Sequence, residues 1–155
     1  KREYYLQQRW YNQAAGIRRT EQTVTPATMI RQSLELERHV SRLDEFRMDR
    51  EGLKVYILDL LSDERMEKLR AFEDKDSMRT ILRTVIRSCR YLTTEQTGQI
   101  AAQIRKAAPG DKQIEQELDE FLHHTRKKKN SEKYTVWLVL LLTALICLLI
   151  FLTGR

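Results

Sequence analysis

The side chains of this chain that could do chemistry are few, and their spacing does not assemble a reactive set. His39, His123 and His124 are its three histidines. His123 and His124 are neighbours, and neighbouring residues on a helix do not share a face, so they lack the spacing of metal ligands. Cys89 and Cys147 lie far apart, which argues against a disulfide and indicates a reducing compartment.

The remaining polar residues complete no catalytic group either. No two glycines lie close enough to cradle a phosphate. The many carboxylates lie on polar helix faces, where solvation or pairing with a cation four residues away explains them. The sequence therefore predicts a protein that is not an enzyme and that holds no cofactor and no metal.

The most regular polar feature is a stripe of four arginines in segment 78–92. They are Arg79, Arg83, Arg87 and Arg90. At 100° per residue they fall within an arc of about 80°, opposite an apolar stripe. No acidic residue lies between Ser77 and Thr94 to neutralise them. Because like charges on one helix face repel each other, we expect a compensating partner.

Three kinds of partner could compensate this arginine stripe. The first is intramolecular, from acidic residues of neighbouring segments: Glu115, Glu117, Asp119 and Glu120, or Asp63, Glu64 and Glu67. The second is an acidic partner protein or anionic lipid headgroups. The third, nucleic acid, is disfavoured because interleaved aromatic residues and a recognisable binding motif are missing.

The N-terminal arm, residues 1–20, is the second candidate partner-binding surface. Its aromatic residues Tyr4, Tyr5, Trp10 and Tyr11 stand among five Arg or Lys residues, with Glu3 the only acid before Thr20. Tyr, Trp and Arg are the residues that most often anchor interfaces. A short helix near 2–14 is not stable alone, so we expect it to dock on the chain's own bundle, on another protein or on a membrane surface.

The length and uncharged composition of segment 134–154 predict a transmembrane helix. Its 21 residues include no charged side chain, and at about 1.5 Å per residue they reach roughly 30 Å, the thickness of a bilayer's hydrocarbon core. A basic juxtamembrane segment, 126–133, precedes it. The residues expected at the membrane interface are Arg126, Lys127, Lys128, Lys129, Lys133, Tyr134 and Trp137.

This charge asymmetry predicts that the N-terminal bulk of the chain faces the cytoplasm or an organelle matrix, because Arg155 alone follows the span. The first residues have no apolar signal-peptide region. Together these features describe a tail-anchored, single-pass protein. The Leu-rich span favours the endoplasmic reticulum. The missing initiator methionine leaves open either a chain cut from a longer one or a removed presequence. A removed presequence would favour a mitochondrial membrane, which is the alternative.

Helices must position all these residues, because glycine and proline are scarce and Leu, Glu, Gln, Arg and Lys are plentiful. Capping signals include Thr25 before Pro26, Ser62, Asp76 or Ser77, Thr93 with Gln96, and Asp111. The helices are expected near 2–14, 26–50, 53–60, 63–74, 78–92, 94–107 and 112–128. The last of them is expected to break at Asn130–Ser131 or to continue into the span.

The expected fold class is all-α: a small helical bundle over 53–125, preceded by a long amphipathic helix over 26–50 and followed by one C-terminal transmembrane helix. Apolar residues at three- and four-residue spacing give the bundle its buried faces. They are Met66, Leu69, Phe72, Met78, Ile81, Leu82, Val85, Ile86, Cys89, Leu92, Ile114, Leu118, Phe121 and Leu122.

Two functional classes fit this organisation. In the first, the chain is a non-catalytic adaptor or accessory subunit of a larger membrane-associated complex. In the second, its span oligomerises as part of a channel or transport assembly, or the chain is a tail-anchored regulator of membrane fusion or apoptosis. The span has no ionisable residue of the kind that marks an ion path. The sequence therefore favours the adaptor.

Overall fold

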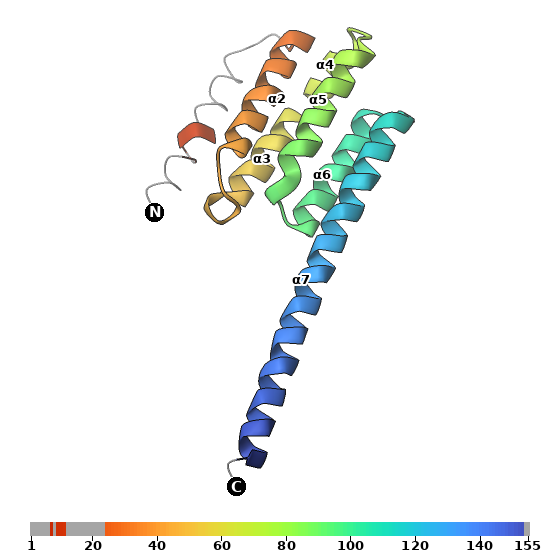
Figure 1. Ribbon diagram of the computed structural model, residues 1–155. Coiled ribbons are helices and arrows are strands. Elements are labelled where there is room, and N and C mark those ends of the chain that lie inside the picture. Colours follow the sequence, from red (N-terminus) through yellow and green to blue (C-terminus); the bar gives the residue numbers. More distant parts are fainter. Residues whose placement is uncertain (1–6, 8, 12–23, 154–155) are drawn as a thin grey trace. The chain divides into compact units, whose positions relative to one another are not determined.

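The computed structural model describes residues 7, 9–11 and 24–153, with side chains described at 7, 9–11, 24–127 and 137–144. Every regular element in this described part is helical, which confirms the all-α fold class (Figure 1). The chain divides into two compact units, Lys1–Phe121 and Leu122–Arg155. The N-terminal helix expected near 2–14 falls mostly outside the described residues, with helical backbone described at 7 and 9–11.

Six α-helices and two short 3-10 helices follow one another from residue 26 onward. They are α2 (Pro26–Ser41), η1 (Glu45–Arg47), α3 (Arg50–Leu60), α4 (Asp63–Arg70), α5 (Lys75–Ser88), η2 (Cys89–Tyr91), α6 (Thr94–Ala107) and α7 (Lys112–Thr153).

Side-chain caps explain where most of these helices begin. Thr25 caps α2 in a capping box with Thr28, and Thr93 caps α6 in the predicted box with Gln96. The cap predicted at Asp76 or Ser77 is wrong, because the Asp74 carboxylate already accepts a hydrogen bond from the Ser77 backbone N–H at 3.0 Å. The helix α5 therefore begins at Lys75.

The long helix expected over 26–50 ends instead at Ser41. The chain then turns through η1, where Asp44 is in an extended conformation. Asp49 caps a new helix by accepting a hydrogen bond from the Gly52 N–H at 3.1 Å. Because Asp49 supplies this cap, α3 starts at Arg50, which is the last residue of the range expected for the long helix.

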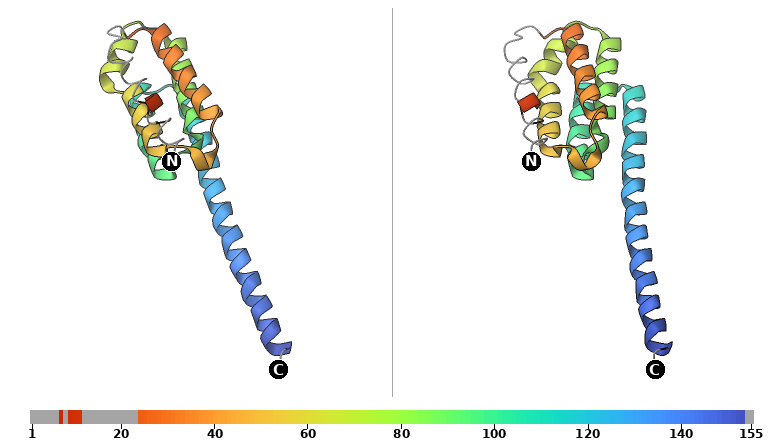
Figure 2. Two further views of the ribbon diagram at one scale, coloured as in Figure 1. Left: turned by 90° about the vertical axis from the view of Figure 1, so that its left-hand side faces the viewer. Right: turned by 60° about the vertical axis from the view of Figure 1, so that its left-hand side comes forward.

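The helix α2 is part of the bundle. It packs along α5, and α3 packs against α6 (Figures 1 and 2). Leu36 and Val40 are buried on the face of α2, as Ile81, Leu82 and Val85 are on α5. The bundle of this protein therefore includes residues 26–41 as well as the predicted segment from Leu53 onward.

Most residues of the predicted apolar faces are buried, but Phe121 and Leu122 are only half-buried and Phe72 is exposed. Met66 and Leu69 are almost fully buried on α4, and Ile114 and Leu118 are on α7. Phe72, expected on the same face as Met66 and Leu69, is 51% exposed. The reason is that α4 ends at Arg70, so Phe72 lies in the turn that follows and is no longer on the helical face.

The helix α7 is assigned from Lys112 to Thr153, and it includes Asn130 and Ser131, where a break was considered. A search restricted to the described residues finds no helix that is both long and apolar enough to cross a membrane. In the second unit, side chains are described at 122–127 and 137–144.

Candidate interaction surfaces

The helix expected over 78–92 ends at Ser88, so Arg79, Arg83 and Arg87 lie on α5 and Arg90 lies in η2. This arginine stripe is held largely by the bundle itself. Arg79 Nε lies 2.7 Å from Asp111 Oδ2, and Arg83 Nε lies 2.7 Å from Glu117 Oε1. The hydrogen bond from Arg79 lowers the pKa of the Asp111 carboxyl and raises that of Arg79 itself. Acidic residues of the same chain therefore pair with these two arginines, as in the first of the three alternatives above. Glu117 is one of the acids predicted there.

The other two arginines of the stripe are both exposed and differ in their contacts. Arg90 donates a hydrogen bond to the backbone oxygen of Val40 at 2.8 Å, and its guanidinium lies 4.7 Å from the centre of the Tyr91 ring. Arg87 approaches Glu37 at 3.9 Å, and its side chain remains 70% exposed. Arg87 is thus the member of the stripe that is most available to a partner.

The sequence missed Asp111 and Glu37 as acids for this stripe. Asp111 was predicted as a helix cap, and it does accept hydrogen bonds from Gln113 N and Ile114 N. One of its oxygens caps α7 while the other pairs with Arg79. Glu37 pairs with α5 because α2 packs along α5, which no local pattern indicated.

The described part of the N-terminal arm docks on the bundle. The Trp10 ring stacks on His39 with ring centres 3.9 Å apart and planes within 1° of parallel. It also stacks on Tyr56 at 5.3 Å. Tyr11 is 6% exposed, and its hydroxyl lies 3.8 Å from the sulfur of Met48. Tyr4 and Tyr5 lie outside the described residues.

Gln7, which the sequence did not single out, ties the arm to the connection between α2 and α3. Its side-chain nitrogen donates to the Arg47 carbonyl, and its oxygen accepts from the Asp49 N–H at 2.7 Å. Gln7 is 3% exposed. A buried amide that satisfies two backbone groups of another segment positions that segment. No sequence pattern marks Gln7, because its partners are backbone atoms about 40 residues away.

Burial shifts the titration of the groups around this aromatic cluster. Burial lowers the pKa of His39 below its usual value, and the nearby Arg42 lowers it further. The Nε2 atom of His39 is buried without a hydrogen-bond partner. Burial also raises the pKa of Tyr11, and the Asp49 carboxylate adds to that shift. The cluster therefore holds His39 neutral and Tyr11 protonated.

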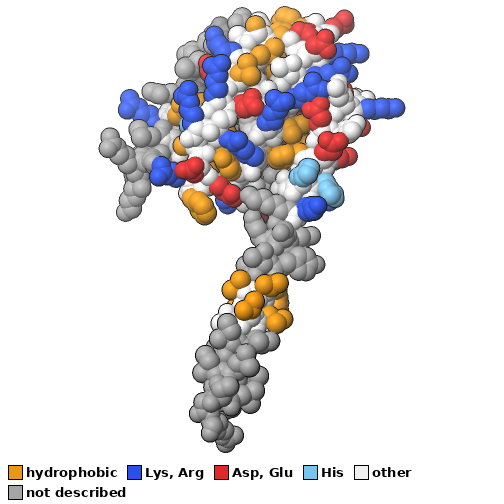
Figure 3. All heavy atoms as spheres, in the orientation of Figure 1, with side chains coloured by type: hydrophobic (Ala, Val, Ile, Leu, Met, Phe, Trp, Pro, Cys, Tyr) orange, Lys and Arg blue, Asp and Glu red, His pale blue; other side chains and the backbone are white. Residues whose placement is uncertain are grey.

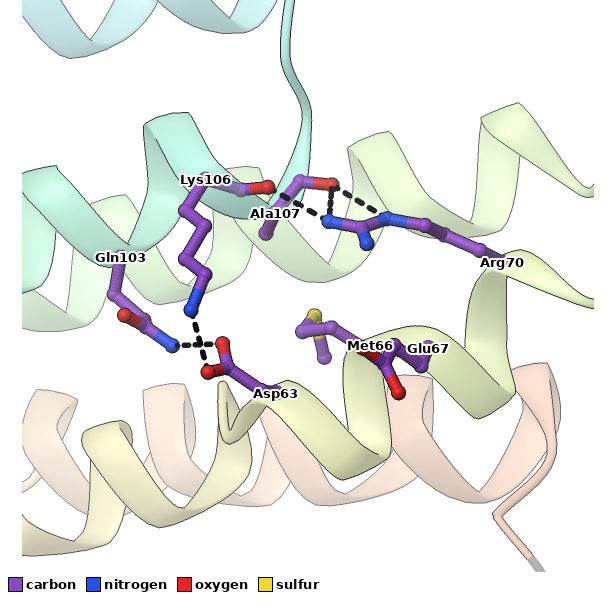
Figure 4. Close-up of a pocket in the computed structure, with 7 residues that line it drawn as sticks. All are labelled: Asp63, Met66, Glu67, Arg70, Gln103, Lys106 and Ala107. Carbon is purple, nitrogen blue, oxygen red and sulfur yellow. Dashed lines mark hydrogen bonds and ion pairs between the residues drawn. The ribbon is translucent and has the colours of Figure 1, made fainter.

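A network of polar contacts joins α4 to α6 around a small pocket of about 60 Å³ (Figure 4). Arg70 donates hydrogen bonds to the backbone oxygens of Lys106 and Ala107, and so caps the C-terminus of α6. Asp63 accepts from Gln103 at 2.9 Å and from Lys106 at 2.5 Å. These contacts lower the pKa of Asp63. The pocket is too small and too internally bonded to bind a substrate.

A larger cleft of about 960 Å³ opens between the α4–α5 turn and the α6–α7 turn. Its apolar lining includes Leu69, Met78 and Pro109. Glu73 lies on its rim with a left-handed φ of 54°, a conformation that is strained for a non-glycine residue. We call this feature the turn cleft. It is larger than the pocket between α4 and α6.

The described residues of α7 in the second unit present a different surface. Arg126 and Lys127 are exposed, as are all eight side chains of 137–144. Trp137 is 71% exposed, and Leu141 is 66% exposed. Figure 3 shows the segment 137–144 as a hydrophobic band on α7. On the face of the bundle in view, positive and negative side chains are interspersed. The side chains of Lys128, Lys129, Lys133 and Tyr134 lie outside the described set.

Among the cysteine and histidine side chains described, Cys89 is shielded by burial, whereas His123 and His124 are exposed. Cys89 is buried, and burial raises the pKa of its thiol to about 12. No cluster of three or more His, Cys, Asp or Glu among the described residues could hold a metal ion. The side chain of Cys147 is not described. Comparison with known protein families, curated protein sequences and solved structures finds no significant match to this chain.

Proposed function

We propose that this chain is a single-pass membrane protein whose helical bundle acts as a non-catalytic adaptor or accessory subunit of a larger membrane-associated complex. The observation that carries the proposal is the set of eight consecutive exposed side chains at 137–144 on α7. Eight residues cover more than two turns of a helix, so they point in every direction around its axis. Thr143 is the only polar residue among them.

A helix that is apolar on every side needs an apolar environment on every side. A surface helix of a globular protein, or one lying flat on a membrane, would separate its apolar and polar faces. The Thr143 hydroxyl donates to the Val139 carbonyl at 2.8 Å, so its polar group is satisfied within the helix, as a bilayer requires. The uncharged segment 134–154 is long enough to span the hydrocarbon core.

The adaptor role rests on how the bundle uses its polar groups. The acids and bases with shifted pKa values serve as helix caps, as ion pairs within or between helices, or as buried packing groups, as Asp74, Asp111 and Tyr11 illustrate. None of these arrangements pairs a nucleophile with a base. The two features of the bundle that we assign to a partner are the exposed guanidinium of Arg87 and the turn cleft.

Two measurements test the proposal. The first expresses the full chain in cells and extracts the membranes at alkaline pH, and we expect the chain to stay with the membrane pellet. The second purifies it in mild detergent, and we expect it to migrate in a complex much larger than its 18.5 kDa. A chain that is released by alkali has no membrane anchor, and one that migrates alone is not a subunit.

Point variants locate the adaptor surface. Arg87→Glu reverses the exposed charge, and Ala108→Trp places a large side chain in the turn cleft, which Ala108 lines. Arg38→Glu on α2 is the matched control, since it makes the same charge change at an exposed site. We expect one of the first two variants to lose the co-purifying partners while the control keeps them. If all three keep them, the bundle is not the adaptor surface.

A further inference from the structure

The positive charge of this chain is not carried by its described bundle. Residues 24–121 contain 17 Lys and Arg against 19 Asp and Glu, although the whole chain has a net charge of +6. Residues 122–155 contain six Lys and Arg against one acid, and five of the six fall within the basic segment 126–133. The excess positive charge next to the apolar segment is therefore concentrated in segment 126–133. We expect an anionic partner to lie beside that segment.

The helix α7 sets how far each of these cations lies from the apolar segment. Because Lys112–Thr153 is a single helix, positions along its axis follow from the rise of about 1.5 Å per residue. Measured from Trp137, Lys133 lies about 6 Å along the axis, Lys129 about 12 Å and Arg126 about 17 Å. A break at Asn130–Ser131 would have removed this fixed spacing.

These spacings match the layers of a membrane surface. A headgroup layer is about 5–7 Å thick on each side of the hydrocarbon core, and tryptophan favours its inner edge. With Trp137 at that edge, Lys133 lies among the headgroups. Arg126 and Lys127, both exposed, lie about one Debye length above them at physiological salt, roughly 8 Å. At that height a cation responds to the net charge of the surface.

We propose that segment 126–133 of α7 recognises anionic phospholipid headgroups in the membrane that the helix enters. The inference rests on the membrane anchor proposed above and names the partner of that same segment. An acidic protein could also bind five cations, but nothing would hold it at a set height. The lipid surface lies at the required height as soon as the apolar segment is inserted.

The test uses the full chain reconstituted in vesicles of phosphatidylcholine with a minor fraction of phosphatidylserine. Spin-labelled forms of the two lipids report which one is immobilised at the protein, and their ratio is the selectivity. We expect the wild-type chain to prefer phosphatidylserine. Because each cation near an anionic surface strengthens attraction up to about fivefold, we expect a variant with glutamine at 126–129 to lower the selectivity roughly threefold or more.

Salt dependence and a control variant show whether the lipid selectivity comes from segment 126–133 or from the net charge of the whole chain. The preference should be strongest near 0.01 M salt, where the Debye length is about 30 Å, and should vanish near 1 M, where it is about 3 Å. The control is a triple variant with Arg38→Gln, Lys75→Gln and Lys112→Gln, all exposed positions of the bundle. It removes a similar charge and should keep the wild-type selectivity.

The outcomes distinguish the inference from the anchor on which it rests. Alkaline extraction of the same vesicles reports anchoring. If the chain remains in the membrane but shows no preference for phosphatidylserine, or keeps it in the glutamine variant, the inference is overturned and the anchor stands. If the variant loses a co-purifying protein without any change in lipid selectivity, the segment binds an acidic protein instead. If alkali releases the chain, both proposals fall.

Discussion

Arg83 on α5 and Glu117 on α7 form a direct ion pair, with Arg83 Nε 2.7 Å from Glu117 Oε1. Their side chains are 32% and 35% exposed, so solvent weakens the pair without abolishing it. The pair fixes the register of the first turns of α7 on α5. A feature that reads as a binding stripe in the sequence is here part of the bundle's internal packing.

Exchanging these two charges should show the pairing. We expect Arg83→Glu and Glu117→Arg each to lower the free energy of unfolding by about 1 kcal/mol, because each places like charges together across the helix interface. The double exchange should recover most of the loss. Urea unfolding of the full chain in mild detergent, followed by circular dichroism at low salt, measures this double-mutant cycle. Purely additive losses in the double variant would mean that the two residues do not interact.

Glycine at position 52 is required by the docking of the N-terminal arm. A Cβ added there would lie 2.8 Å from the Tyr11 ring and would overlap the Asp49 carboxylate. We expect Gly52→Ala to destabilise the bundle by about 1–3 kcal/mol, in spite of the better helix propensity of alanine. Thermal unfolding checks this.

Gly98 on α6 is the matched control for that substitution, since a Cβ there meets nothing within 4 Å. We expect Gly98→Ala to stabilise the bundle by roughly 0.8–1 kcal/mol, which is the helix-propensity gain alone. Equal effects of the two substitutions would contradict the close packing of Tyr11 on Gly52.

The docking of the arm should weaken in mild acid. The pKa of His39 is lower in the folded chain than its usual 6.5, so the unfolded chain binds this proton more readily. Stability from His39 is therefore fully present above about pH 6.5 and is lost as the pH falls through the folded pKa. Trp10 stacks on His39, so its fluorescence reports the change.

The measurement follows Trp10 fluorescence from about pH 7.5 to 5, the range in which histidine titrates, in a Trp137→Phe background. Unfolding at both ends of this range gives the change in stability. A His39→Gln variant should show no such titration. A wild-type stability that stays flat, or rises, as the pH falls would contradict a neutral His39 in the folded chain.

Arg70 should contribute more to stability than its exposed neighbours on α4. It donates hydrogen bonds to two carbonyl oxygens at the end of α6, from Lys106 and Ala107. We expect Arg70→Gln to cost about 1–2 kcal/mol, because the helix end loses a charged cap. Lys68→Gln removes only an exposed ion pair with Glu64 and should cost less than about 0.5 kcal/mol. Comparable losses would mean that Arg70 does not act as a cap.

Several local features could be predicted because they depend on neighbouring residues alone. The cap at Thr25, the box of Thr93 with Gln96 and the bounds of α6 follow from side chains that act within one turn. The helix α4 also begins after Ser62 as predicted, although the Ser62 side chain makes no capping hydrogen bond. The buried face of α5 follows from helical periodicity, and Ile81, Leu82 and Val85 are fully buried as expected. The end of the long helix at Ser41 and the cap that Asp49 supplies to α3 were both missed.

Some features of the candidate surfaces likewise depend on neighbouring residues alone, and others depend on residues that are distant in the sequence. The sequence by itself determined the uncharged segment 134–154, the cations that precede it and the spacing of Arg79, Arg83 and Arg87 on one helix, since each depends only on residue type and helical spacing. Only the tertiary structure decided that Asp111 and Glu117 pair with the stripe, that Trp10 stacks on His39 and that Arg87 remains exposed. Those contacts join residues tens of positions apart, and their formation depends on which helix faces pack together, which no local pattern specifies.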